Sequence, residues 1–185
     1  YNITAAIALA LELGADFAAA SRAAAAFKGV DRRFQRIGEV KGTLVVDDYA
    51  HHPTEVAALL KASREFIKQE RQGKGRVICL FQPHQPGRLR DLWKEFLVAF
   101  DDADLAFLSD IYIARGGAIE GITSEIFVKE VANKHTHYLP GKLNELADNL
   151  LPHINEGDLV LTVGAGDITK VGPVLVEKLE TKLGG

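Results

Sequence analysis

The sequence predicts an α/β fold built on a doubly wound, mostly parallel sheet and preceded by a short helical segment. The first observation is that, from residue 34 onward, short apolar runs alternate with longer segments of helical character. The second is that the runs at residues 44–46, 77–81 and 159–163 are apolar almost throughout. Parallel strands need helical crossovers and are covered on both faces, so their residues are apolar without alternation.

Local signals set the order of the elements. Gly14 separates two alanine-rich helical stretches, and Asp16 is placed to cap the second. Lys41 and Gly42 form a turn between the first two strands, and Pro53 fits the first turn of a helix. We expect helices at residues 2–13, 16–27, 53–70, 89–100, 124–133, 142–150 and 168–182. We expect strands at residues 34–40, 43–46, 76–81, 104–109, 136–139 and 158–163.

Composition limits the kinds of partner. Lys and Arg number 22 against 25 Asp and Glu, a net charge of −3, which argues against nucleic acid or an anionic membrane. No apolar run approaches the roughly 20 residues that span a bilayer. The single cysteine, Cys79, excludes an internal disulfide and fits a core position in a cytoplasmic protein. A small molecule or a protein is the expected partner, and the sequence carries no signal for a particular oligomeric state.

Polar and glycine-rich segments follow four of the predicted strands, at residues 47–53, 82–90, 110–112 and 164–167. The carboxyl ends of parallel strands meet at one edge of the sheet, where ligands of such folds bind. These segments therefore predict one site at that edge.

The segment at residues 47–53 has three interpretations. Asp47 and Asp48, with His51 and His52, could bind a divalent metal, since carboxylate and imidazole are common ligands. They could also hold a ribose through its hydroxyl groups, or form a helix cap with solvated imidazoles. Successive residues of a turn point in different directions, so the metal set lacks a well-placed third ligand.

Cationic residues stand near two other strands. His84, Arg88 and Arg90 lie between a strand and a helix start, where an anion such as a substrate carboxylate fits, although the arginines could equally face solvent. The pair Arg32–Arg33 precedes the first strand and could be surface decoration. The segment 164–167, GAGD, allows a tight turn or close approach to a ligand, but lacks the spacing of a phosphate-binding loop.

Seven segments, in order along nearly the whole chain, resemble the Mur ligase family. Each is modest alone, and the ordered set is specific. The segments are VDRRFQ (30–35), DDYAHHPTE (47–55), FQPH (81–84), RLRDL (88–92), SDIY (109–112), GITSE (121–125) and LTVGAGDI (161–168).

The resemblance implies a domain organisation. The family has an N-terminal domain for the UDP moiety, a central ATPase domain with a P-loop, and a Rossmann-like C-terminal domain that closes over the site with the amino acid. Residues 1–30 resemble the last helices of the central domain, and residues 31–185 the C-terminal domain. The chain also opens as the middle of a helix with no initiator methionine, so we expect it to be part of a longer protein.

The resemblance also implies an activity. The most similar member joins L-alanine to the lactyl carboxylate of UDP-N-acetylmuramate through an acyl phosphate, using ATP and Mg²⁺, which the central domain mainly binds. The implied ATP contacts are Asn2, Arg33 and Asp48, and the implied amino-acid contacts are Tyr49, His51, His84 and Arg88. The family often has a second cation where this chain has Gln85, so that role does not transfer. Without a P-loop, these 185 residues are expected to be inactive alone.

Three other functions compete with this one. The related ligase that recycles murein tripeptide carries a similar acid-acid-aromatic-Ala-His-His-Pro stretch. The chain could also be a non-catalytic, nucleotide-binding Rossmann-like module. A small metal hydrolase using Asp48 and His51 is the third alternative.

Overall fold

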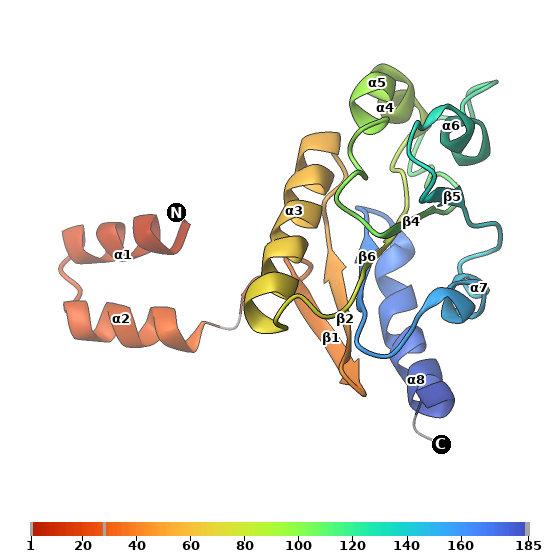
Figure 1. The fold of residues 1–185 in the computed structure, drawn as a ribbon. Coiled ribbons are helices and arrows are strands. Elements are labelled where there is room, and N and C mark those ends of the chain that lie inside the picture. Colours follow the sequence, from red (N-terminus) through yellow and green to blue (C-terminus); the bar gives the residue numbers. More distant parts are fainter. Residues whose placement is uncertain (1, 28, 184–185) are drawn as a thin grey trace. The chain divides into compact units, whose positions relative to one another are not determined.

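The computed structural model describes residues 2–27 and 29–183, which fall into two compact units, Tyr1–Asp31 and Arg32–Gly185 (Figure 1). The first unit holds two helices, α1 (Asn2–Glu12) and α2 (Phe17–Ala26). Asp16 caps α2, because its carboxylate accepts a hydrogen bond of 2.9 Å from the Ala19 N–H. Both helices and the cap agree with the sequence prediction.

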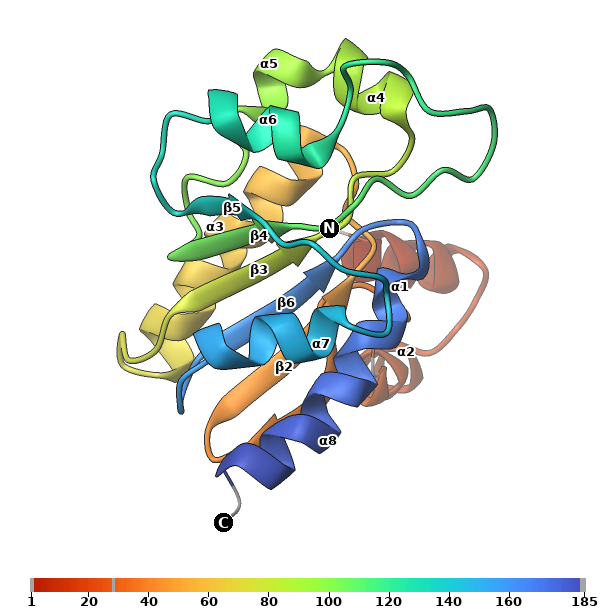
Figure 2. The same cartoon turned by 90° about the vertical axis from the view of Figure 1, so that its right-hand side faces the viewer.

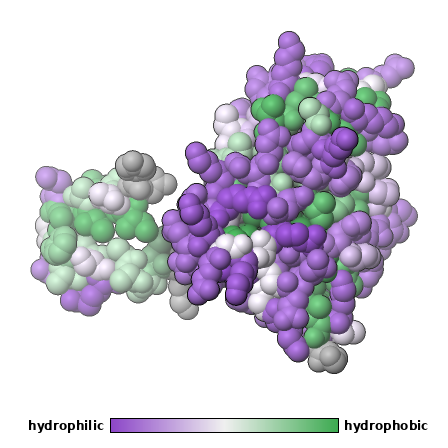
Figure 3. All heavy atoms as spheres, viewed as in Figure 1, coloured by the Kyte–Doolittle hydropathy of each residue, from purple (hydrophilic) through white to green (hydrophobic). Residues whose placement is uncertain are grey.

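The two helices of the first unit turn apolar side chains toward each other, as the green atoms of this unit show in Figure 3. Large apolar side chains nevertheless stay exposed, with Leu13 at 80% and Phe17 at 65% of their full exposure. No residue of α2 is buried. The pair on its own therefore buries little apolar surface, which is the main source of stability for packed helices.

The second unit is built on one six-stranded sheet. Its strands are β1 (Gln35–Val40), β2 (Thr43–Asp48), β3 (Val77–Phe81), β4 (Leu105–Leu108), β5 (Thr136–Tyr138) and β6 (Leu159–Val163). The strand order is β1-β2-β6-β3-β4-β5, with β1 antiparallel to β2 and all other pairs parallel. The mostly parallel sheet is confirmed, and the carboxyl ends of β2, β6 and β3 lie next to one another.

Helices cover both faces of this sheet, so the doubly wound prediction is also confirmed. The helical elements are α3 (Pro53–Glu70), α4 (Pro86–Asp91), α5 (Trp93–Phe96), α6 (Ser124–Glu130), α7 (Leu146–Leu150), η1 (Leu151–His153), η2 (Asp167–Lys170) and α8 (Val171–Leu183). One apolar cluster joins the sheet to α3, α4, α5 and α6, and the other joins it to α7 and α8 (Figure 2). Cys79 is fully buried in the first cluster, as expected.

Several boundaries differ from the prediction. The helix expected at residues 89–100 begins earlier, at Pro86, and breaks at Leu92, whose φ of −113° and ψ of 25° are not helical. Leu89 and Phe96 are thereby buried from two short helices. The last helix was expected from residue 168, but a 3₁₀ turn occupies residues 167–170. Pro173 has no N–H to donate to residue 169, so regular α-helical bonding begins later.

Three further boundaries were also misplaced. The helix expected at residues 124–133 ends at Glu130, because Val131 turns to an extended conformation and is buried. The helix expected from residue 142 begins at Leu146, after a turn in which the Glu145 carboxylate accepts from the Lys142 N–H. The strand expected to end at residue 46 continues through Asp48. Among the residues that the structure describes, no helix is long and apolar enough to cross a membrane.

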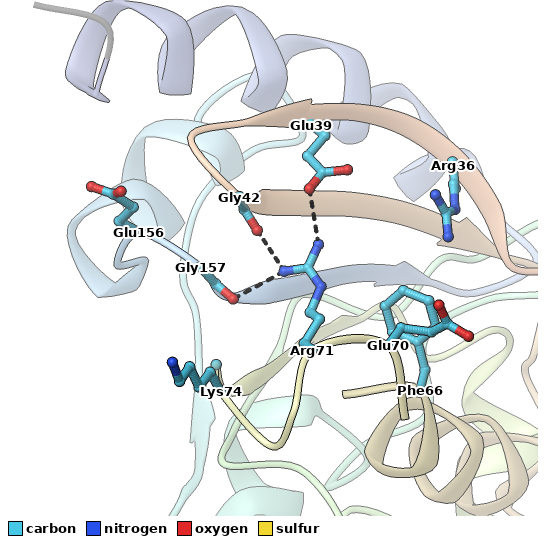
Figure 4. Close-up of a pocket in the computed structure, with 10 residues that line it drawn as sticks. Arg36, Glu39, Gly42, Phe66, Glu70, Arg71, Lys74, Glu156 and Gly157 are labelled. Atoms are coloured by element: carbon cyan, nitrogen blue, oxygen red, sulfur yellow. Dashed lines mark hydrogen bonds and ion pairs between the residues drawn. The ribbon is translucent and has the colours of Figure 1, made fainter. Parts of the chain in front are cut away.

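Arg71 joins three segments at the end of the sheet where β2 and β6 begin (Figure 4). It follows α3, and its guanidinium donates to the Gly42 carbonyl, to the Gly157 carbonyl at 3.1 Å and to Glu39 at 3.2 Å. A surface pocket lies here, but the protein's own acceptors occupy this guanidinium. Arg71 therefore acts as a structural contact that holds the hairpin turn and the loop before β6.

We expect Arg71→Gln to lower the free energy of unfolding by about 1–3 kcal/mol. The reason is that the charge-assisted hydrogen bonds that Arg71 donates to Glu39 and to the Gly42 and Gly157 carbonyls are lost. Urea unfolding followed by circular dichroism measures the change. Arg90→Gln is the matched control, since Arg90 is exposed and pairs with its exposed neighbour Asp91. Equal midpoints for the two variants would contradict the structural role of Arg71.

Candidate functional site

Four rings form a row at the carboxyl edge of the sheet. Tyr49 and His51 follow β2, His84 follows β3, and Tyr112 follows β4. The ring centroids of successive members are 5.3, 6.0 and 5.6 Å apart. The structure therefore brings together three of the predicted site residues, Tyr49, His51 and His84, and adds Tyr112 to them.

A buried carboxylate stands two residues before Tyr49 in the chain. Asp47 is fully buried in β2, and its carboxylate accepts three hydrogen bonds. The donors are the Thr162 hydroxyl at 2.7 Å, the Thr169 hydroxyl at 2.9 Å and Arg32 Nε at 3.2 Å. Strand register explains the first of these, because Asp47 pairs with Thr162 across the β2–β6 ladder. A buried charge needs such partners to offset its desolvation.

Arg32 connects this carboxylate to two segments of the site. Its guanidinium also donates to the carbonyls of Gly164 and Gly166 and lies 4.8 Å from the centroid of the Tyr49 ring. Its own carbonyl accepts from the Tyr49 N–H at 2.8 Å. Arg32 therefore fixes both Tyr49 and the glycine turn after β6. The interpretation of residues 32 and 33 as a surface pair is wrong for Arg32.

Asp48 and Arg33 were the expected ATP contacts. Both oxygens of Asp48 accept backbone N–H groups, from Phe34 at 2.7 Å and from Ala50 at 2.8 Å. Each oxygen keeps a second lone pair for a ligand hydroxyl. Arg33 is exposed, 5.9 Å from the Tyr49 ring centroid. Asn2 begins α1, but its side chain lies outside the described residues.

The two adjacent histidines have different roles. His52 is the N-cap of α3, where it accepts from the Thr54 N–H, and Glu55 completes a capping box. Burial alone would raise the pKa of Glu55, but the backbone N–H groups of His51 and His52 lower it overall. His51 Nδ1 lies 3.0 Å from the Tyr49 carbonyl, which can only accept. His51 Nδ1 must then carry the proton, and Nε2 is left as an acceptor.

His84 offers the complementary group. Arg88 Nη1, which can only donate, lies 3.3 Å from His84 Nδ1, so the proton of neutral His84 sits on Nε2. Burial lowers the pKa of His84, and the charges of Arg88, His51 and Arg115 lower it further. Arg90 instead faces solvent and pairs with Asp91, so the structure separates Arg90 from His84 and Arg88.

The glycine turn after β6 packs tightly against the end of β3. Gly164 has a φ of +146°, and a Cβ there would lie 2.8 Å from the Gln82 carbonyl oxygen. A Cβ on Gly166 would lie 2.6 Å from Cγ of Tyr112. Gln82 donates to Asp167 at 2.9 Å and accepts from the Ile168 N–H. Close packing therefore explains both glycines, and the positive φ also favours glycine at position 164.

Arg32 and Gln82 are the residues that the sequence analysis missed. Thr162, beside Asp47 in the register of two parallel strands, would have indicated that Asp47 faces inward and needs a cation. In the part of the chain that the structure describes, no group of three or more His, Cys, Asp or Glu residues is placed to hold a metal.

We expect Asp47→Asn to lower the free energy of unfolding by about 2–4 kcal/mol, because Arg32 and two buried hydroxyl groups lose their charged acceptor. Chemical denaturation measures the difference. Asp101→Asn serves as the control, since Asp101 is exposed. A loss no larger than that of the control would mean that the buried carboxylate contributes little.

His84 should make stability depend on pH. Its pKa in the folded chain lies below the value of 6.5 for an unperturbed imidazole, so the unfolded chain binds the proton first as pH falls. This contribution favours folding less as pH decreases below about 6.5. His84→Gln lacks this loss, so its free energy of unfolding relative to wild type should be higher at pH 5.5 than at pH 7.5. Urea midpoints at both values test this, with the exposed His137→Gln as control.

Comparison with known proteins identifies the family of this chain. Residues 32–166 match the Mur ligase, glutamate ligase domain. The UDP-N-acetylmuramate--L-alanine ligase of Desulfotalea psychrophila is 41% identical over 97% of this chain, and that of Anaeromyxobacter dehalogenans is 46% identical over 97%. In both cases the match covers 38% of the relative, so the chain spans well under half of their length.

A solved structure gives the same result. The chain aligns with the UDP-N-acetylmuramate-alanine ligase of Thermotoga maritima with a TM-score of 0.76 and 29% identity, over 98% of this chain and 37% of that one. The family match covers most of the sheet and every strand-end segment of the candidate site up to Gly166. On this basis, the chain belongs to the Mur ligase family.

Proposed function

We propose that this chain is the amino-acid-binding portion of an ATP-dependent UDP-N-acetylmuramate--L-alanine ligase. The observation that carries the proposal is the row Tyr49–His51–His84 with Arg88 beside it, at the sheet edge where α/β folds bind ligands. The relatives with this name match the chain over nearly its whole length. The reaction uses ATP and a nucleotide sugar, and its proposed location is the cytoplasm.

The incoming amino acid would bind along the row of rings. Arg88 is half-buried and supplies a guanidinium for a carboxylate. His51 offers an acceptor at Nε2 and His84 a donor at Nε2, as their bonded Nδ1 atoms require. Tyr49 is 37% exposed and presents a ring face that Arg32 holds in place. This combination suits a small zwitterion such as L-alanine.

The ATP would bind at the Tyr49 end of the row of rings. Arg33 is exposed there and would offer its charge to the phosphates, while Asp48 would accept from a ribose hydroxyl. Asn2 is a third proposed contact. Mg²⁺ usually binds through one or two carboxylates together with substrate phosphates. As the family resemblance implies, we assign Mg²⁺ mainly to the central domain of the full-length ligase.

The chemistry needs positioning and charge neutralisation. ATP transfers its γ-phosphoryl group to the lactyl carboxylate of UDP-N-acetylmuramate, giving an acyl phosphate and ADP. The alanine amine then attacks the acyl carbon, and phosphate leaves from the tetrahedral intermediate to form the amide. The residues of this chain would orient the amine, neutralise the carboxylate and exclude water that would hydrolyse the acyl phosphate.

The helical unit fits the same proposal. Residues 1–30 would be the last helices of the central ATPase domain, and that domain would cover the exposed apolar residues of α1 and α2. The G-x-x-x-x-G-K-[ST] pattern of a P-loop does not occur in these 185 residues. The isolated chain should therefore not form the amide bond.

We expect the full-length ligase that carries this domain to release phosphate from ATP when supplied with UDP-N-acetylmuramate and L-alanine. In that enzyme, Arg88→Met should raise the KM for L-alanine about tenfold or more, because a charged hydrogen bond to the carboxylate is lost. Steady-state phosphate release measures both effects.

Arg90→Met is the control and should leave this KM unchanged, since Arg90 faces solvent. The murein tripeptide tested in place of L-alanine separates the recycling ligase from the proposed activity. Faster ligation of the tripeptide would overturn the proposal, as would amide formation by the 185 residues alone.

A further inference from the structure

The segment after β4 is tied to the candidate site through its backbone. The Tyr112 N–H donates to the Pro83 carbonyl at 2.8 Å, and the Tyr112 carbonyl accepts from the Gln85 N–H at 2.9 Å. The Tyr112 ring also stacks on His84, with an interplanar angle of 18°. Residues 83–85 and the chain at Tyr112 therefore form a short parallel bridge at the site.

The side chain of Gln85 extends this connection to Arg115. In the amide orientation that satisfies both of its polar atoms, Gln85 Nε2 donates to the Arg115 carbonyl at 2.9 Å. Its Oε1 accepts from the Arg115 N–H at 3.3 Å. Gln85 has a φ of +72°, which is costly for a residue with a side chain. These bonds offset that cost and hold the Arg115 backbone beside the residue that follows His84.

The surroundings of His84 carry a surplus of positive charge. Besides burial, the permanent charges of Arg88 and Arg115 lower the pKa of His84. Arg115 is exposed, and across residues 2–27 and 29–183 no carboxylate forms an ion pair with it. Uncompensated cations around a half-buried group favour an anionic ligand.

We infer that Arg115, held through its backbone by Gln85, is a further substrate-binding residue that contacts the carboxylate of the incoming amino acid together with Arg88. The inference rests on the proposed function and adds a specificity-determining residue to it. A second guanidinium would distinguish a free amino acid from an analogue without a carboxylate. Arg33 lies at the Tyr49 end of the row and Arg115 at its Tyr112 end, so the phosphates and the carboxylate have separate cations.

In the full-length ligase, Arg115→Gln should raise the KM for L-alanine about tenfold and leave the KM for ATP unchanged. Arg115→Lys, which keeps the charge without the planar fork, should give an intermediate value. Arg90→Gln is the matched control, because it removes an exposed arginine of the neighbouring helix. An unchanged KM for L-alanine, or a raised KM for ATP instead, would overturn the inference.

Gln85→Gly tests the positioning step. Glycine adopts a positive φ without strain, so this change removes the side chain and keeps the backbone conformation. Its KM for L-alanine should rise as in Arg115→Gln, and the double variant should be no worse than either single variant. If the increases in KM of the two single variants multiply in the double variant, Gln85 does not act through Arg115.

L-Alaninamide, used as an inhibitor, provides a control for the ligand. It has no carboxylate, so its inhibition constant should be the same for wild type and Arg115→Gln. A constant that rises as much as the KM for L-alanine would overturn the carboxylate assignment. A wild-type enzyme that ligates the tripeptide but not L-alanine would instead overturn the proposed function.

Discussion

The site depends on one ion pair, between the buried Asp47 and the partly exposed Arg32. A fully buried carboxylate in the middle of a sheet is costly, and three donors converge on it. One donor, Thr162, lies on the neighbouring strand β6, and another, Thr169, lies in the 3₁₀ turn that leads into α8. Arg32 adds the segment that enters the domain. The ion pair therefore holds three separate stretches of chain together. Arg32 also positions Tyr49 and the glycine turn, through the hydrogen bonds that it makes to both.

The candidate site consequently has a rigid part and a part that depends on loops. Asp48 ends β2 and Tyr49 and His51 follow it, and their backbone or side chains are bonded to Arg32, Glu55 and neighbouring amides. On the other side, residues 112–121 form no long helix or strand, and the bonds at Tyr112 and Gln85 fix their start. Binding sites gain precision when such loops are fastened to a rigid scaffold, and this is the role that Gln85 has here.

The sequence predicted the sheet well because continuous apolar runs are a strong signal for buried parallel strands. From the strand ends it predicted that residues 47–53 and 82–90 meet at one edge, and the structure brings Tyr49, His51, His84 and Arg88 of these segments together. The sequence-based prediction failed where tertiary contacts determine the local structure. Leu92 looks helical in sequence, yet the chain breaks there so that Leu89 and Phe96 are both buried. Arg32 and Arg33 are adjacent and chemically identical, and the sequence does not indicate which of them contacts the buried Asp47.

Some charged side chains at the sheet edge are bonded within the protein, and others are free to contact a ligand. The chain has a net charge of −3, but its acids at this edge are bonded within the protein: Asp47 to Arg32 and two hydroxyl groups, Asp48 and Glu55 to backbone amides, Asp110 to Tyr138 and Asp167 to Gln82. Arg33, Arg88 and Arg115 form no ion pair with a carboxylate among the described residues. These three arginines are therefore the cations at this edge that remain available to a negatively charged ligand. The proposed reaction brings together a triphosphate, an acyl phosphate and an amino-acid carboxylate, and these arginines would offset part of their negative charge.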